Sequence, residues 1–249
     1  MSATFACASA SVSAHASSTG QEEDISFADL IASSIHDMKN SLSVQISALE
    51  KISAQTKQDG DESGYQDLGG VIYQASRMNA NLVQLLCLYK MDKSIYPVDI
   101  AQHSIADLIN DVMLLHRSIM EFKNIEVEID CPEDCYGYMD HDLIVGVLIN
   151  ALNNAYQYTK DKIRIVARAD NNGLEIRVED NGKGYPNFML RNTELADKKG
   201  VNFFTGSTGL GFYFSSRVAH VHKNGERHGQ LIIENGGTYG GGCFVLRLP

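Results

Sequence analysis

The N-terminal part of the chain carries apolar residues with the period of an α-helix. Between residues 25 and 54 they recur in steps of three, four and seven, at Ile35, Met38, Leu42, Leu49 and Ile52, with Ile46 close to the same stripe. The polar, glycine-containing stretch TKQDGDESG (56–64) breaks this pattern. A second apolar stripe follows, made of Leu68, Val71, Ile72, Ala75, Met78, Leu82, Leu85, Leu86 and Tyr89. The two stripes predict two helices joined by a short loop, which is an antiparallel hairpin.

A lone helical hairpin leaves half of each apolar stripe in contact with water. Pairing with a second copy of the same hairpin would bury both stripes in a four-helix bundle. The pattern therefore predicts a homodimer.

The periodicity changes after the segment DKSIYPVDI, where Pro97 marks a break. Beyond it the pattern predicts helices at 105–122, 143–158 and 212–222, and strands at 125–130, 162–169, 174–180, 229–235 and 242–249. Helices mixed with hairpin-linked strands indicate an α+β fold in which one sheet is covered by helices on one face. We therefore predict a disordered tail (1–24), a helical hairpin (25–93), a linker (94–102) and an α/β sandwich domain (103–249).

Composition and charge narrow the function classes. The net charge of −10 argues against non-specific binding of nucleic acid, because the chain offers no general neutralisation of phosphate. No apolar run approaches the roughly 20 residues that span a bilayer, and residues 1–20 lack the basic residues of a signal peptide. The five cysteines are odd in number and scattered, which favours reduced thiols. We expect a cytoplasmic protein without membrane insertion.

Three segments of the second domain carry candidate chemistry. Asn150 and Asn154 share one face of a predicted helix, where amide oxygens would suit Mg²⁺ beside substrate phosphates, although solvated amides are an equally simple reading. Asp180 ends a predicted strand and opens DNGKG, which would suit a purine amine or form an ordinary turn. The loop GSTGLG (206–211) opens a helix and favours a phosphate. Each signal is weak alone, and their order along the chain gives them weight.

These segments resemble a known family. LINALNNAYQYT, VEDNGKGYP and TGSTGLGFYF resemble the N, G1 and G2 boxes of the histidine-kinase ATP-binding domain, which is of the gyrase/Hsp90-like ATPase type. SIHDMKNSL (34–42) resembles the phosphoacceptor H box of the dimerisation domain that precedes it, and GGTYGGGCFVLRLP resembles the closing strand. The resemblance covers residues 25–249 with the boxes in the family order. It implies a two-component sensor histidine kinase, here in a form without its own sensor domain.

The resemblance also implies site residues for ATP and Mg²⁺. Asn154 would lie nearest the Mg²⁺ ion and Asn150 would support the triphosphate. Asp180 would accept the hydrogen of the adenine amino group, and residues 186–205 would form a mobile lid with Phe203 and Phe204 as its latch. The remaining residues surround the nucleotide: Tyr158 packs on the adenine, Gly182 and Gly184 make room for the ring, and Gly206, Thr208, Gly209, Leu210 and Gly211 belong to the loop that closes over the phosphates.

In the H box, the resemblance implies that His36 is the phosphoacceptor. It lies about 100° around the helix from Ile35 and therefore off the bundle core. One imidazole nitrogen would attack the γ-phosphorus of ATP while Asp37 accepts the hydrogen bond of the other. The phosphate would then pass to an aspartate of a response-regulator receiver domain. Asn40, one helical turn after His36, would align water for a phosphatase activity, or would be simply solvated.

Two departures from the family pattern leave alternatives open. Gln157 stands where the family often has a basic residue, so a phosphate contact is missing or comes from Lys160 or Lys183, which concerns turnover more than binding. No sensor or membrane segment precedes the hairpin, so the signal is expected from a partner sensor protein or a soluble ligand. The alternatives are a degenerate kinase that acts as an ATP-binding adaptor or phosphatase, an anti-sigma-type serine kinase, and a purely structural dimer.

Overall fold

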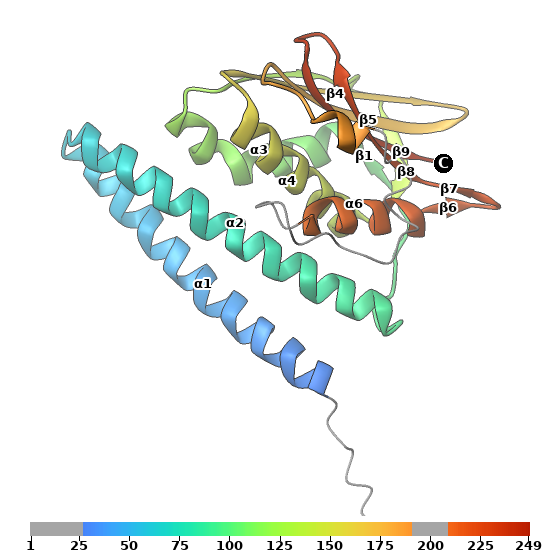
Figure 1. Ribbon diagram of the computed structural model, residues 1–249, viewed down its shortest axis with the longest axis horizontal. Coiled ribbons are helices and arrows are strands. Elements are labelled where there is room, and N and C mark those ends of the chain that lie inside the picture. Colours follow the sequence, from blue (N-terminus) through green and yellow to red (C-terminus); the bar gives the residue numbers. More distant parts are fainter. Residues whose placement is uncertain (1–26, 191–208) are drawn as a thin grey trace, which may run out of the picture.

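The computed structural model describes residues 27–190 and 209–249. It begins with a hairpin of two long helices, α1 (Phe27–Gln58) and α2 (Glu62–Asp92), followed by a layered α/β domain (Figure 1). The predicted fold class is confirmed. The predicted tail lies outside the described residues, as do residues 191–205 of the predicted lid, including Phe203 and Phe204.

The turn between α1 and α2 is shorter than the sequence pattern predicts. The first helix continues to Gln58, and Gly60 then takes a left-handed backbone conformation with a φ of +78°. Asp61 caps the next helix, because its carboxylate accepts a hydrogen bond from the Gly64 N–H at 2.9 Å. The polar residues 56–58 therefore extend the first helix instead of ending it.

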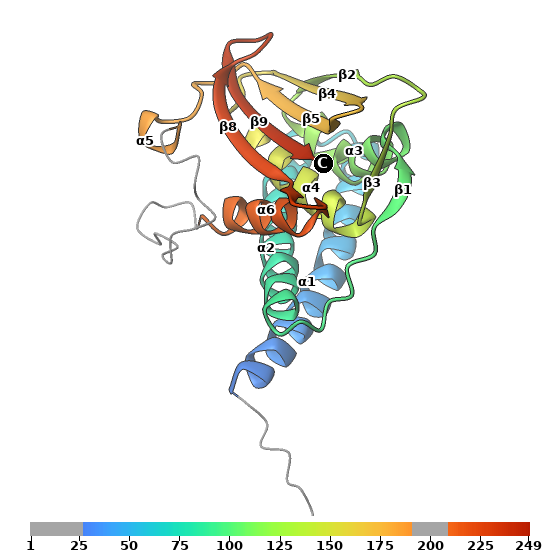
Figure 2. The same ribbon diagram turned by 90° about the vertical axis from the view of Figure 1, so that its right-hand side faces the viewer.

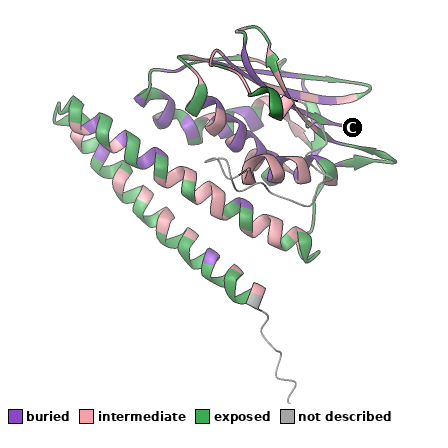
Figure 3. Ribbon diagram, in the orientation of Figure 1, coloured by how far each residue is buried: buried purple, intermediate pink, exposed green. Residues whose placement is uncertain are grey.

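The apolar residues of the hairpin fall on two sides. On the inner side of α1, Ile35 is buried and Leu42 and Leu49 are half-buried against α2. Met38 and Ile52, which belong to the predicted stripe, are instead about half exposed. They join an exposed apolar surface on both helices, which consists of Leu30, Ile31, Met38, Val44, Ile52, Val71, Met78, Val83 and Leu85. Figure 3 shows the exposed outer sides of both helices. The homodimer stays a prediction, and this surface is the one it would bury.

A third side of α2 packs against the α/β domain, which the sequence pattern did not reveal. The Tyr73 ring lies 4.3 Å from the Tyr156 ring between centroids, and Cys87, Leu88 and Met91 join the core of that domain. Gly69 lies against the Phe122 ring so closely that an added Cβ would come within 2.4 Å of it. Helix α2 thus lies between α1 and the α/β domain (Figure 1).

The α/β domain is built on one five-stranded sheet with helices on one face (Figure 2). The strand order is β2-β4-β5-β9-β8, with β2 parallel to β4 and the other pairs antiparallel. The strands of this sheet are β2 (Glu126–Asp130), β4 (Lys162–Asp170), β5 (Gly173–Asp180), β8 (Gln230–Gly236) and β9 (Gly241–Leu248). The helices are α3 (Ile105–Phe122), α4 (His141–Tyr158), α5 (Asn187–Leu190) and α6 (Leu210–Val221).

The predicted helices and strands of this domain agree with the structure to within two residues at either end. Two small sheets were missed, because strands of two to four residues carry too little pattern to be recognised. One pairs β1 (Ala101–Ser104) with β3 (Tyr136–Met139), and the other pairs β6 (Lys223–Asn224) with β7 (Arg227–His228). The first pair converts the end of the predicted linker into part of the domain.

The two faces of the main sheet differ as alternation predicts. The face toward the helices is apolar and buried, as at Ile163, Ile165 and Ile176. The outer face carries cross-strand ion pairs, including Arg164 with Asp130 and Arg177 with Glu234, both at 2.6 Å between nitrogen and oxygen. The charged side chains on this solvent-facing side of the sheet thus pair with one another.

A buried histidine ties the end of α6 to the start of α4. His222 Nδ1 donates to the Val218 carbonyl at 2.7 Å, and His222 Nε2 accepts from the Asp140 N–H at 3.0 Å. Since a carbonyl only accepts and an amide N–H only donates, the imidazole must be neutral. Burial lowers the pKa of His222, against smaller opposing effects of the Val218 carbonyl and the Asp140 carboxylate. Burial likewise lowers the pKa of His116 on α3.

The two buried histidines predict a loss of stability in mild acid. As the pH falls below the ordinary histidine pKa of 6.5, the unfolded chain binds protons that the folded chain excludes. The unfolding free energy should therefore decrease, by at most about 1.4 kcal/mol per pH unit for each histidine. Urea unfolding between pH 5.5 and 7.5 measures this slope. His222→Gln should flatten it, and an equal slope in both proteins would contradict the assignment.

Candidate nucleotide and phosphoacceptor sites

The carboxylate of Asp180 is buried at the end of β5 within a cradle of backbone amides. Its Oδ1 accepts hydrogen bonds from the Gly182 N–H at 2.7 Å and the Gly242 N–H at 3.2 Å. Burial raises the pKa of the carboxyl, and the two amides offset this only in part. A Cβ at position 242 would come within 2.8 Å of Oδ2. Among the described residues no hydrogen bond engages Oδ2, so it can accept one from the amine of a ligand.

Asn181, which the sequence reasoning passed over, fixes the loop that follows Asp180. Its Oδ1 accepts from the Thr159 hydroxyl at 2.8 Å and from the backbone N–H groups of residues 160–162 at 3.1 to 3.2 Å. Its Nδ2 donates to Asp161 at 2.7 Å. These bonds hold the end of α4, where Tyr158 is half exposed, beside the Asp180 loop. The DNG sequence (180–182) therefore forms a turn that hydrogen bonds of Asn181 fix to the end of α4.

Asn150 and Asn154, one turn apart on α4, have different surroundings. Asn150 is buried, and its Nδ2 donates to the Ser215 hydroxyl of α6 at 3.1 Å. Gly211 lies so close that an added Cβ would come within 2.0 Å of Asn150 Oδ1. Asn150 and Gly211 thus lie at the contact between α4 and α6. The contact of Asn150 with the triphosphate stays a prediction. The sequence could not separate the two asparagines, because it shows their common face but not what covers it.

The Asn154 amide is better placed for a ligand. Its Nδ2 is buried and finds no hydrogen-bond partner among the described residues. Buried polar groups are normally paired, so an orphaned one indicates a missing partner. A terminal amide can present either its N–H or its oxygen after a flip. The side chain therefore fits the predicted neighbourhood of a triphosphate and Mg²⁺.

Helix α6 presents its N-terminus to the same region. Gly209 is its N-cap, with a φ of +59°, and no side chain of the described residues caps the first turn, which begins at Leu210. The N–H groups of this turn and the helix dipole favour an anion such as phosphate. Gly206 and Thr208 of the predicted loop lie outside the described residues. Helix α4 packs against both β5 and α6, so the elements that carry Asp180, Asn154 and Gly209 are neighbours although these residues are far apart in the sequence.

The predicted phosphoacceptor lies on α1 and is exposed. The side chain of His36 is 56% exposed and that of Asp37 is 79% exposed. His36 Nδ1 lies 3.5 Å from Asp37 Oδ1 and 3.3 Å from the Asn40 amide nitrogen. A hydrogen on Nδ1 can bond Asp37 and leaves Nε2 as the nucleophile, whereas an Nδ1 that accepts from Asn40 places the hydrogen on Nε2. The two neighbours therefore favour opposite tautomers.

The structure does not bring His36 to the Asp180 region. Helix α2 lies between α1 and the α/β domain (Figure 1). An ion pair between Lys57 of α1 and Glu121 of α3, at 3.7 Å, connects α1 to the α/β domain. It lies at the opposite end of α1 from His36. Helix α2 therefore separates α1, which carries His36, from the domain that carries Asp180.

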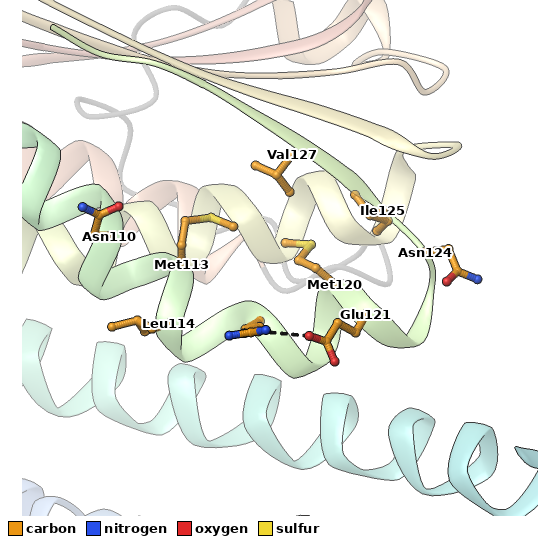
Figure 4. Close-up of a pocket in the computed structure, with 9 residues that line it drawn as sticks. Asn110, Met113, Leu114, Met120, Glu121, Asn124, Ile125 and Val127 are labelled. Atoms are coloured by element: carbon orange, nitrogen blue, oxygen red, sulfur yellow. Dashed lines mark hydrogen bonds and ion pairs between the residues drawn. The ribbon is translucent and has the colours of Figure 1, made fainter. Parts of the chain in front are cut away.

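A hollow of about 700 Å³ lies between α3 and β2, and none of the predicted site residues lines it (Figure 4). Its walls are mainly apolar and include an ion pair between Arg117 and Glu121 at 3.0 Å. The lining residues are Asn110, Met113, Leu114, Arg117, Met120, Glu121, Asn124, Ile125 and Val127. It is separate from the nucleotide region.

Comparison with known proteins gives the family of the α/β domain. Residues 139–249 match the family of histidine kinase-, DNA gyrase B-, and HSP90-like ATPases. These residues include Asn154, Asp180 and Gly209. The domain belongs to this ATPase family.

The homology extends from the ATPase domain into the hairpin. The chain is 24% identical to the adaptive-response sensory kinase SasA of Synechocystis over 246 residues, which cover 91% of this chain and 60% of that one. It is also 24% identical to the sensor-like histidine kinase SenX3 of Mycobacterium bovis over 226 residues, covering 89% of this chain and 53% of that one. The chain is therefore a homologue of histidine kinases and spans somewhat more than half the length of these relatives.

A solved structure supports the arrangement of hairpin and ATPase domain. The Acinetobacter baumannii histidine kinase AdeS superimposes with a TM-score of 0.54 at 18% identity, covering 84% of this chain and 96% of that one. At this identity the likeness concerns the fold alone. None of the described helices has the length and apolar character that a membrane crossing requires.

Replacing Asp180 with Asn tests the nucleotide site. In the variant the N–H groups of Gly182 and Gly242 hold the amide oxygen, so the NH2 group, which cannot accept, takes the place of Oδ2. ATP should therefore bind roughly 10- to 100-fold more weakly, as expected for a hydrogen bond to a charged group. The fold should persist, because a neutral amide is easier to bury than a carboxylate. Calorimetric titration with ATP measures the affinity. Asp170→Asn, at the other end of the β4–β5 hairpin, is the matched control, and equal affinities in the two variants would contradict the site.

Proposed function

We propose that this chain is a histidine protein kinase of a two-component system, which phosphorylates itself on His36 with ATP and passes the phosphate to an aspartate of a receiver domain. The observation that carries this proposal is the exposed His36 beside Asp37 on a hairpin that is joined to a histidine kinase-type ATPase domain. An exposed imidazole with an adjacent carboxylate is suited to nucleophilic attack, and the ATPase domain supplies the phosphoryl donor.

The ATPase domain's residues would bind and orient ATP. Asp180 Oδ2 accepts the hydrogen of the adenine amino group, and Tyr158 covers the ring. The N–H groups of the first turn of α6 hold the phosphates. Asn154 would hold Mg²⁺, which neutralises charge on the transferring phosphoryl group. Asn150 supports this arrangement indirectly, since its hydrogen bond to the Ser215 hydroxyl sets the distance between α4 and α6.

The phosphoacceptor step follows from the tautomer that Asp37 favours. With its hydrogen on Nδ1 bonded to Asp37, His36 attacks the γ-phosphorus through the Nε2 lone pair. The Nε2–phosphorus bond forms as the bond from the γ-phosphorus to the bridging oxygen breaks, and ADP leaves with the electron pair. Asp37 stabilises the positive charge that develops on the ring. A receiver-domain carboxylate then takes the phosphoryl group from Nε2 and restores the imidazole.

The position of α2 shapes how this step can occur. His36 and the nucleotide site lie on different sides of α2, so the ATPase domain must leave its position or serve the His36 of a second copy. The exposed apolar surface of the hairpin is suited to a homodimer, which provides that second copy. A partner sensor protein or a soluble ligand that alters the packing on α2 would control the step, in a cytoplasmic setting.

Labelling with ATP tests the kinase proposal. The purified chain is incubated with Mg²⁺ and γ-labelled ATP beside His36→Gln. The expected label is acid-labile, alkali-stable and absent from the variant, because a phosphoramidate forms only on His36. Acid-stable label would favour the serine kinase alternative. ATP binding without label would favour the degenerate kinase, in which Gln157 replaces a basic residue. Label that persists in His36→Gln would mean that another histidine is the acceptor.

A phosphatase activity is the second candidate function, and the contact between Asn40 and His36 favours it. The Asn40 amide lies 3.3 Å from His36 Nδ1 and is exposed on the same side of α1. When it donates to Nδ1, the hydrogen of the ring lies on Nε2, so Nε2 has no lone pair for attack and that of Nδ1 is engaged by Asn40. The amide and His36 then jointly face a docked receiver domain, where they can align a water molecule toward its phosphoaspartate.

Replacing Asn40 with Ala should separate the two activities. Dephosphorylation of the phosphorylated receiver domain should fall at least about tenfold, the usual contribution of a group that positions a reactant. Autophosphorylation should persist or rise, since the competing tautomer is no longer favoured. Asn81→Ala, on α2, serves as the matched control. Unchanged dephosphorylation in Asn40→Ala would refute the role, as would a parallel loss of both activities.

A further inference from the structure

The loop after Asp180 is held by a residue far away in the sequence. Asn235, at the end of β8, forms two hydrogen bonds with the backbone of Tyr185: the Tyr185 N–H donates to Asn235 Oδ1 at 2.6 Å, and Asn235 Nδ2 donates to the Tyr185 carbonyl at 2.9 Å. The orientation of the amide is unambiguous, because the backbone N–H can only donate and the carbonyl can only accept. The Asn235 side chain thus gives the Tyr185 backbone one acceptor and one donor, as the backbone of a neighbouring strand would.

The contact is close as well as directional. Gly184 has a φ of +72°, and an added Cβ there would come within 2.7 Å of Asn235 Oδ1. The Asn235 side chain therefore occupies the place where a side chain at position 184 would lie. Residues 182–185 pass between Asp180 and the first residue of the predicted lid, so their path determines the shape of the base site.

The turn that follows Asn235 and the start of β9 contact β5 at two more points. The Thr238 N–H donates to Glu179 Oε2 at 2.9 Å, and the Gly242 N–H donates to Asp180 Oδ1 at 3.2 Å. The end of β8, the turn and the start of β9 therefore bond Tyr185, Glu179 and Asp180, respectively. Figure 2 shows β8 and β9 beside β5, with α5 next to β8.

We propose that Asn235 is a positioning residue that sets the selectivity of the nucleotide site for adenine over guanine. This inference rests on the proposed function, since it takes ATP as the ligand of Asp180. Asn235 touches neither the base nor the phosphates. It acts by fixing the loop of residues 182–185, and with it the Gly182 N–H that aims the Asp180 carboxylate.

The chemistry of the two bases makes this role measurable. Adenine presents an amino group at position 6, which donates to a carboxylate, whereas guanine presents an oxygen there, which a carboxylate repels. Discrimination between them depends on holding Asp180 at the correct distance and angle, because hydrogen bonds weaken steeply with misalignment. Without Asn235 the loop moves, and the Gly182 N–H moves with it. Asp180 then loses one of the two N–H groups that bond its Oδ1.

The experiment compares ATP and GTP binding to the full chain in the presence of Mg²⁺ by calorimetric titration. In Asn235→Ala, the affinity for ATP should fall about tenfold while that for GTP changes little, so the ratio of the two affinities falls about tenfold. Asn235→Asp keeps the acceptor for the Tyr185 N–H and loses the donor, so its ratio should be intermediate. The charge it adds acts equally on both nucleotides and cancels in the ratio.

The controls separate positioning from general stability. Asn172→Ala removes an exposed asparagine at the other end of β5 and should keep the wild-type ratio. Asn235 is itself exposed, so Asn235→Ala should unfold at nearly the wild-type temperature. A wild-type preference for ATP that survives unchanged in Asn235→Ala would overturn this proposal alone. A wild-type chain that binds neither nucleotide, or both equally, would overturn the proposed function together with it.

Discussion

The burial of one carboxylate, that of Asp180, is the constraint on which the ATPase domain depends. Removing a carboxylate from water is costly unless hydrogen bonds replace the solvent, and here two backbone N–H groups do so. Backbone can approach this closely only where side chains are absent, which accounts for the glycines at 182, 241 and 242. The glycine-rich start of β9 therefore forms part of the cradle of Asp180, although it lies about 60 residues further along the chain.

The helices of the site are held in place by polar contacts that are buried with them. Asn150 bonds Ser215 near the middle of α4, and His222 bonds the Asp140 backbone at its start. Two such contacts fix both the separation and the rotation of α4 against α6, which apolar packing alone would specify less sharply. The Asp140 carboxylate also accepts from the Asp99 N–H at 3.0 Å, so the linker from the hairpin reaches this same junction.

Helix α2 connects the hairpin to the ATPase domain because three of its sides are apolar. One packs on α1, one on the ATPase domain, and one is open on the surface that a second copy would cover. The close contact between Gly69 and Phe122 is part of the packing of α2 on the ATPase domain, and α1, which carries His36, lies on another side of α2.

The sequence by itself determined the elements, their order and the residue types of the site. Helical and strand periods are local properties, so the hairpin, the strands of the main sheet and the ends of most elements could be predicted. The position of Asp180 at a strand end and the placement of His36 off the core could be predicted for the same reason. Only the tertiary structure decided which neighbours these residues meet. Asn150 and Asn154 look alike in sequence, but the packing of α6 gives Asn150 a partner in Ser215, whereas Asn154 Nδ2 is buried with no hydrogen-bond partner among the described residues. No local pattern marked Asn235, because it bonds the backbone of Tyr185, 50 residues away. Backbone groups are the same in almost every residue type, so a sequence cannot point to such a partner.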